Sequence, residues 1–372
     1  TYTDAVALTG TTTLTSSGNQ AITFNNTVNG AQSLTLNVGT GNIAITGTVG
    51  GLTPLTDMTV SNAGNVTFGN NVTTTGNLLQ SAGTGITTLN GATVGGNLTL
   101  TTGAITLATA SVSVTGGPIV LTAANSVNQN ASLTASGANP VSVTATGGAI
   151  TMAGTATTTS GTGAVTYNAG TNVTLGSLST GGGVNVSANG GSVFSAAGSG
   201  TNLTAGANST LQAFNGVVGT SVAPVTVNVN PGTLSIRATT AVAGISAFLT
   251  GIVFPGNALT LLNVPPGLVC FNGCPIIVSN NPFANFGFIP SFNRDSAIPW
   301  YLHEPSDPPI VSVLSMYIPG TVVAEAVTDV KSNDQSVARE IPPCYPESAC
   351  KPGASVLTAP ADEEDSELPA AK

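Results

Sequence analysis

The sequence predicts an all-β protein built as a solenoid, in which short strands stack coil upon coil. Three observations predict this class. A triplet of one apolar, one small polar and one apolar residue recurs, glycine-rich corners separate the triplets, and charged residues make up only 6% of the 372 residues. Alternation with a period of two is typical of a strand with one buried face. Glycine supplies the backbone angles that tight corners require.

The triplets continue along the chain as far as Ile236, and the spacers between them vary in length. Examples are Ile22-Thr23-Phe24, Leu34-Thr35-Leu36, Leu98-Thr99-Leu100, Val141-Ser142-Val143, Val165-Thr166-Tyr167 and Leu234-Ser235-Ile236. We expect Val, Leu and Ile to fill the interior, and Thr and Ser to form ladders on the outside. At roughly 20–30 residues per coil, the body would hold about 8–12 coils. A β-sandwich is the alternative.

Charge divides the chain into an almost uncharged body and an acidic tail. Positions 1–290 contain only Asp4, Asp57 and Arg237 as charged residues, whereas positions 291–372 hold thirteen acids and five bases. Like charges stacked about 4.8 Å apart would repel, which explains why a solenoid body lacks them. We predict a repeat body over residues 1–260, a capping segment over 261–320 and an acidic, partly irregular tail over 321–372.

The predicted capping segment is rich in proline, cysteine and aromatic residues. We expect it to cover the apolar surface and strand edges at one end of the solenoid. The same residues are candidates for an interface with a neighbouring subunit or another partner. These cap or interface candidates are Phe283, Phe286, Phe288, Phe292, Trp300, Tyr301 and Tyr317.

Three repeats carry a resemblance to a known family. They are Gly64-Asn65-Val66-Thr67-Phe68, Gly96-Asn97-Leu98-Thr99-Leu100 and Thr171-Asn172-Val173-Thr174-Leu175. They resemble the repeats of filamentous-haemagglutinin-like exoproteins, the adhesins of bacterial two-partner secretion systems, over about residues 1–280. The resemblance implies a right-handed parallel β-helix on the bacterial cell surface, used for adhesion, filament formation or biofilm matrix.

The resemblance also implies partners and a longer precursor. The family is exported through an outer-membrane secretion pore, and its members bind one another or host-surface glycans and proteins. Its N-terminal secretion domain carries Asn-Pro-Asn motifs, but other residues follow Asn139-Pro140, Asn230-Pro231 and Asn281-Pro282 here. This chain would therefore be the C-terminal portion of a precursor, either an adhesin fragment or the subunit of a filament.

Four cysteines form two close pairs, Cys270 with Cys274 and Cys344 with Cys350. An even number of cysteines in an exported chain favours disulfides. Short loops are the easiest to close, so we predict local pairing. A zinc site is the alternative, although the spacing differs from common zinc motifs. The resemblance suggests a further role for Cys344 and Cys350, because a similar C-terminal loop retains some relatives at the secretion pore.

The sequence argues against most other functions. Nucleic acid needs clustered basic residues, and this chain has six Lys and Arg against a net charge of −9. We predict no cofactor, metal site or catalytic residue. A glycan-cleaving β-helix would need paired carboxylates, and Asp4 and Asp57 lie far apart in sequence. Binding of ice by outward threonines, as at Thr11-Thr12-Thr13, is the remaining alternative.

Overall fold

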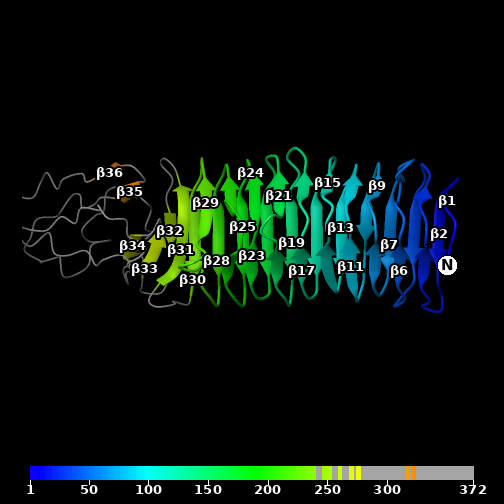
Figure 1. Ribbon diagram of the computed structural model, residues 1–372, viewed down its shortest axis with the longest axis horizontal. Helices are drawn as coiled ribbons and strands as arrows, with labels where there is room; N and C mark the ends of the chain where they lie inside the picture. The colour runs from blue at the N-terminus through cyan, green and yellow to red at the C-terminus, as the bar shows by residue number, and fades with distance from the viewer. Residues whose placement is uncertain are drawn as a thin grey trace, which may run out of the picture.

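The computed structural model describes residues 1–239, 245–253, 259–261, 268–271, 274–277, 316–318 and 321–323. Within them the chain forms a parallel β-solenoid of about 11 coils and contains no helix. The coils stack along the long axis of the molecule, from β1 and β2 at one end to β30–β33 at the other (Figure 1). This confirms the predicted all-β solenoid and its number of coils, while its right-handed sense stays a prediction. No helix in these ranges has the length and hydropathy needed to cross a bilayer.

Three long sheets form the faces of the solenoid, and the central coils contribute one strand to each face. The 12-stranded sheet contains, in order, β2 (Thr12–Thr15), β5 (Leu34–Asn37), β7 (Met58–Asn62), β10 (Leu78–Gln80), β13 (Leu98–Thr102), β16 (Ile119–Ala123), β19 (Val141–Ala145), β22 (Val165–Ala169), β25 (Val184–Ala188), β28 (Ser209–Ala213), β30 (Leu234–Ala238) and β32 (Leu259–Leu261).

The other two long sheets alternate with it along the chain. The 9-stranded sheet contains β3 (Ile22–Phe24), β6 (Ile43–Ile45), β8 (Val66–Phe68), β11 (Ile86–Leu89), β14 (Ala104–Leu107), β17 (Val127–Gln129), β20 (Ile150–Met152), β23 (Val173–Leu175) and β26 (Val193–Ser195). The 11-stranded sheet contains β9 (Val72–Thr74), β12 (Ala92–Val94), β15 (Val112–Val114), β18 (Leu133–Ala135), β21 (Thr157–Ser160), β24 (Ser177–Thr180), β27 (Leu203–Ala205), β29 (Val225–Val229), β31 (Ile245–Val253), β33 (Leu268–Phe271) and β34 (Cys274–Ile277).

Two short pairs complete the strands. They are β1 (Val6–Ala7) with β4 (Val28–Asn29), which is parallel, and β35 (Met316–Ile318) with β36 (Thr321–Val323), which is antiparallel. Single bridges from Val28 to Val49 and from Val49 to Val72 connect the first pair with the start of the 11-stranded sheet.

Apart from register shifts after Leu36 and after Ile245, the paired strands stay in register although the coils differ in length. Leu78 pairs with Leu98 in the next coil. The coil between Leu234 and its partner Leu259 is longer. The difference is absorbed in the corners, because a shift of one residue within a strand would turn its apolar side chains outward. All long-sheet pairings are parallel except β33 with β34, which is antiparallel. Parallel pairing therefore continues past residue 260, to β33.

Alternation along each strand builds one continuous core. In β19, Val141, Val143 and Ala145 are buried, while Ser142 and Thr144 are partly exposed. Most buried apolar residues from Phe24 to Val269 belong to a single cluster, and Phe248 packs separately with Cys270. Each buried Val, Leu or Ile side chain contributes about 1.5–3 kcal/mol. The predicted division into apolar interior and polar exterior is confirmed for these strands.

Asparagine side chains join successive coils at the corners. The Oδ1 atom of Asn42 accepts a hydrogen bond from the backbone N–H of Asn65 at 2.9 Å, and Asn65 Oδ1 accepts one from Ile86 N–H at 2.8 Å. Gly85 must be glycine beside this ladder, because a Cβ there would lie 2.2 Å from Asn65 Oδ1. The glycines and asparagines of the repeat thus have complementary roles.

Two clusters of polar side chains lie within the apolar interior. The sequence analysis predicted the apolar interior but not these clusters. In one, Thr87 Oγ1 donates to Gln80 Oε1 at 2.7 Å, and Thr102 lies 3.3 Å from the same hydroxyl. In the other, the Tyr167 hydroxyl lies 2.6 Å from both Gln129 Oε1 and Thr158 Oγ1. Tyr167 and its two partners are fully buried. Buried polar groups are stable only when bonded in this way.

Candidate functional site: the open N-terminal end

In the first coil, the inward side chains are only partly covered by other described residues. Its inward side chains occupy the same columns as core residues of the second coil: Leu14 pairs with Leu36, and Ile22 pairs with Ile43. Leu36 and Ile43 are buried, whereas Leu14 and Ile22 are only partly buried. The difference arises because no described coil stacks on the outer side of the first one.

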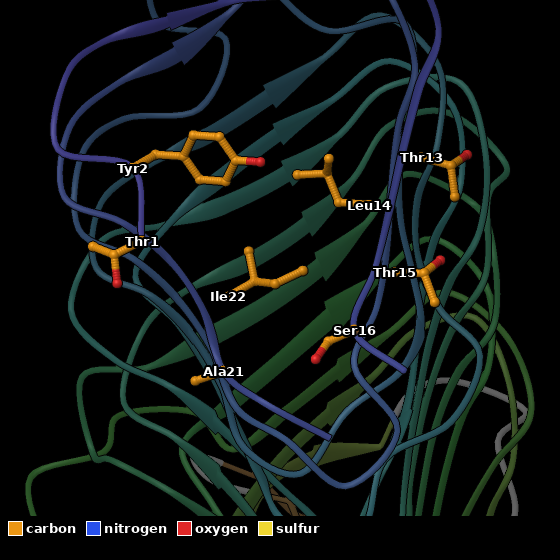
Figure 2. A pocket seen from close by; sticks show the side chains of 8 residues that line it. All are labelled: Thr1, Tyr2, Thr13, Leu14, Thr15, Ser16, Ala21 and Ile22. Atoms are coloured by element: carbon orange, nitrogen blue, oxygen red, sulfur yellow. The ribbon is translucent and has the colours of Figure 1, made fainter. Parts of the chain in front are cut away.

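Tyr2 partly covers this end. Its ring stacks on Phe24 with the centroids 4.7 Å apart and the planes 10° from parallel. Phe24 is buried as a result, but Tyr2 itself remains 41% exposed. Figure 2 shows Tyr2, Leu14 and Ile22 pointing into the interior, while Thr13 and Thr15 point away from it.

A hollow of about 660 Å³ opens at this end. Its apolar residues come from the inward positions, and hydroxyl groups line its rim. The lining residues are Thr1, Tyr2, Thr13, Leu14, Thr15, Ser16, Ala21 and Ile22. A surface that combines an apolar centre with a polar rim fits a partner that supplies apolar side chains of its own.

The strands of the first coil are also sheet edges. β2 ends the 12-stranded sheet and has no strand partner on its outer side among the described residues. β3 ends the 9-stranded sheet, and its outer side is bridged by Tyr2, whose N–H donates to Thr23 O at 2.7 Å and whose carbonyl accepts from Asn25 N–H at 2.9 Å. Natural edges are commonly protected by Lys, Pro or a bulge. The sequence Thr12-Thr13-Leu14-Thr15 has none of these, and Asp4 is the only acidic side chain of this coil. Unpaired backbone groups and open apolar columns therefore coincide.

The described residues hold few ionisable groups, and these lie apart. Asp57 belongs to a corner ladder, because its Oδ1 accepts from Asn77 N–H at 2.7 Å and its Oδ2 from the Ser33 hydroxyl at 3.1 Å. Asp4 precedes β1, and Arg237 lies in β30 at the other end of the solenoid. Within the described ranges, no three His, Cys, Asp or Glu residues gather into a metal-binding group.

One tyrosine has a perturbed acidity. Burial raises the pKa of Tyr167 well above the ordinary 10.0, and its hydrogen bonds to Thr158 and Gln129 offset part of that rise. Its hydroxyl is sealed inside the core, so it has a structural role.

Most of the predicted site residues lie outside the described residues. This holds for Phe283, Phe286, Phe288, Phe292, Trp300, Tyr301, Cys344 and Cys350, and for the side chains of Tyr317 and Cys274. Cys270 is buried in β33. The backbone register pairs Cys274 with Phe271, and Pro275 with Cys270. The predicted disulfides and the capping role of the aromatic residues therefore stay predictions.

The sequence analysis did not name this end as a candidate interface. It assigned the interface to the aromatic segment after residue 260, whereas the described open end lies in residues 1–24. The pattern of the first coil gave no signal for this end, because it has the same apolar alternation as the internal coils.

Comparisons with known protein families, with curated proteins and with solved structures find no match for this chain.

Proposed function

We propose that this chain is a non-enzymatic structural or adhesive rod of the extracellular surface, which associates by stacking β-coils end to end. The observation that carries the proposal is the first coil. It combines edge strands with apolar columns that match those of the next coil residue for residue. The polar, almost uncharged outer faces suit a rod that stays extended.

Strand addition explains how such an end binds. A further β-coil would satisfy the outer backbone groups of β2 and would cover Leu14 and Ile22 at the same time. The occupant must have the same three-sided cross-section, because its apolar positions have to continue three columns. A β-coil of another copy of this chain meets that requirement. An extracellular filament or adhesin assembled in this way agrees with the resemblance of the repeats to secreted adhesins.

Electron microscopy of the purified chain tests the proposal. Long, uniform fibres are the result expected for end-to-end association. Discrete short rods would agree with an adhesive rod but would contradict its end-to-end association. Compact particles without a long axis would contradict both. Leu14→Lys should abolish end-to-end association, because it places a charge in an apolar column. Thr35→Lys is the matched control, since it adds the same charge to an outward position one coil away and should leave association intact.

Ice binding, the alternative function, would need a regular array of outward hydroxyl groups, and the outer surface supports it less well than it supports a structural rod. Thr13, Thr35 and Thr59 form an aligned outward column in the first coils of the 12-stranded sheet. The same column then continues through Leu79, Thr99 and Val120, so apolar residues interrupt the hydroxyl groups. An extended regular hydroxyl array is therefore absent from this column.

The glycan-cleaving alternative needs two carboxylates near one bond. The two acids of the described residues belong to different coils, and Asp57 is held in a structural ladder. The geometry gives this alternative no support.

A further inference from the structure

Asn-Gly dipeptides occur at four described corners: Asn29-Gly30, Asn90-Gly91, Asn189-Gly190 and Asn215-Gly216. This dipeptide can modify itself. The backbone nitrogen of glycine attacks the asparagine Cγ, ammonia leaves, and the resulting succinimide is opened by water to aspartate or isoaspartate. Glycine offers the least steric hindrance to the attack because it has no Cβ. The asparagine side chain must be free to turn toward its own backbone.

Asn29 is held in place. Its Oδ1 accepts from the N–H groups of Leu52 at 2.9 Å and Thr53 at 3.4 Å. The attacking nitrogen of Gly30 is also engaged, because it donates to Thr53 O at 3.1 Å. Both reacting groups must break a hydrogen bond before they can meet.

Asn90 and Asn189 are also held, each by a neighbouring coil. Asn90 Nδ2 donates to Gly69 O at 2.9 Å, and its Oδ1 accepts from Thr109 Oγ1 at 2.7 Å. Asn189 Nδ2 donates to Asn168 Oδ1 at 2.8 Å. Asn189 is exposed, and this is the one hydrogen bond that its side chain makes with a described residue.

Asn215 differs from the other three. It lies in the turn that follows β28, and its side chain makes no hydrogen bond with any described residue. The N–H of Gly216 has no acceptor among the described residues, as is also the case for Gly91 and Gly190, so the side chain of Asn215 is what distinguishes this corner.

The residues on either side of Asn215 are anchored: Phe214 N–H donates to Ala188 O at 2.9 Å, and Gly216 O accepts from Thr239 N–H at 3.2 Å. The side chain of Asn215 itself therefore lacks the restraint that holds the other three asparagines.

We propose that Asn215 is a site of spontaneous deamidation, and that the hydrogen bonds between coils protect the other three dipeptides. The product would place a carboxylate beside Phe214, whose ring lies 4.3 Å from the Arg237 guanidinium carbon. Arg237 is the only basic side chain among the described residues, and its buried Nε has no hydrogen-bond partner. Deamidation would thus add a negative charge next to Phe214, the residue whose ring contacts the Arg237 guanidinium.

Peptide mapping by mass spectrometry tests the proposal on the full chain aged in mildly alkaline buffer. Asn215 should deamidate at least about fivefold faster than Asn29 and Asn90, a ratio that corresponds to about 1 kcal/mol or one hydrogen bond. Asn215→Gln should abolish the signal at this corner. In concentrated urea the rates at all four dipeptides should converge.

A second variant tests the protective mechanism. Asn168→Ala removes the acceptor of Asn189 Nδ2 and should raise deamidation at Asn189 toward the rate at Asn215, without changing Asn215. The proposal is overturned if Asn215 reacts no faster than Asn29 and Asn90 in the folded chain. It is also overturned if Asn168→Ala leaves the rate at Asn189 unchanged.

Discussion

The central coils and the first coil share one residue pattern but differ in what covers it. In the centre, β16, β19 and β22 each have a coil on both sides, and their inward residues are fully buried. In the first coil, equivalent residues face one neighbour and remain partly exposed. The comparison shows that a solenoid residue owes its burial to adjacent coils, because each repeat contacts only its neighbours.

The largest expected effect distinguishes the two regions directly. Leu121→Ala in β16 should destabilise the chain by about 3–5 kcal/mol, because it leaves a cavity in a core that cannot collapse freely. Leu14→Ala should cost about 1 kcal/mol or less, since the same side chain is already partly solvated. Urea unfolding followed by circular dichroism measures both. Equal losses would mean that the first coil is packed as tightly as the centre.

The buried polar cluster provides a second contrast. Tyr167→Phe should cost about 1–3 kcal/mol, because it leaves Gln129 and Thr158 buried with unmet hydrogen bonds. Tyr2→Phe should leave stability almost unchanged, since its ring still stacks on Phe24. Thermal unfolding of the two variants gives the comparison. A neutral Tyr167→Phe would show that the hydrogen bonds of this cluster contribute little to stability.

A corner substitution should have an intermediate effect. Gly85→Ala should destabilise by about 1–3 kcal/mol, because the new Cβ would lie 2.2 Å from Asn65 Oδ1 and 2.8 Å from Gly64 O. Gly10→Ala in the first coil meets no atom within 4 Å and is the matched control. Chemical denaturation of both variants tests whether the corners are tighter inside the array than at its end. Tolerance of alanine at position 85 would contradict the ladder geometry.

Alkaline pH should act mainly through Tyr167. Its pKa is raised in the folded chain above the ordinary 10.0, so folding favours the neutral phenol. The corresponding stability is complete below about pH 10 and is lost as the pH rises through and above that value. Unfolding midpoints measured across this range should fall more steeply for the native sequence than for Tyr167→Phe. Identical pH profiles would remove Tyr167 as the cause.

The sequence predicted the solenoid because the apolar triplets, glycine corners and missing charges all point to the same structure. Val141-Ser142-Val143 could be assigned an inward and an outward face from alternation alone. The interior clusters could not be predicted, because Gln129 and Thr158 are distant in sequence and meet Tyr167 only through the stacking of coils. The asparagine ladders were missed for the same reason, since the acceptor and donor lie a full coil apart.

The open end was missed because the pattern of the first coil is the same as that of an internal coil. Only the absence of a covering neighbour among the described residues distinguishes Leu14 from Leu36. Alternation fixes which side of a strand faces the core, but it does not report how many coils lie beyond that strand.

Hydrogen exchange at two protein concentrations is the sharpest test of the open first coil. In dilute solution, the amides of Thr12–Thr15 should exchange much faster than those of Val141–Ala145, because the first coil has one neighbour only. At high concentration, the first coil should gain protection as ends associate, while the central coils stay unchanged. Protection of Thr12–Thr15 equal to the centre in dilute solution would contradict the open end. A first coil that stays unprotected at every concentration would contradict its association with another coil.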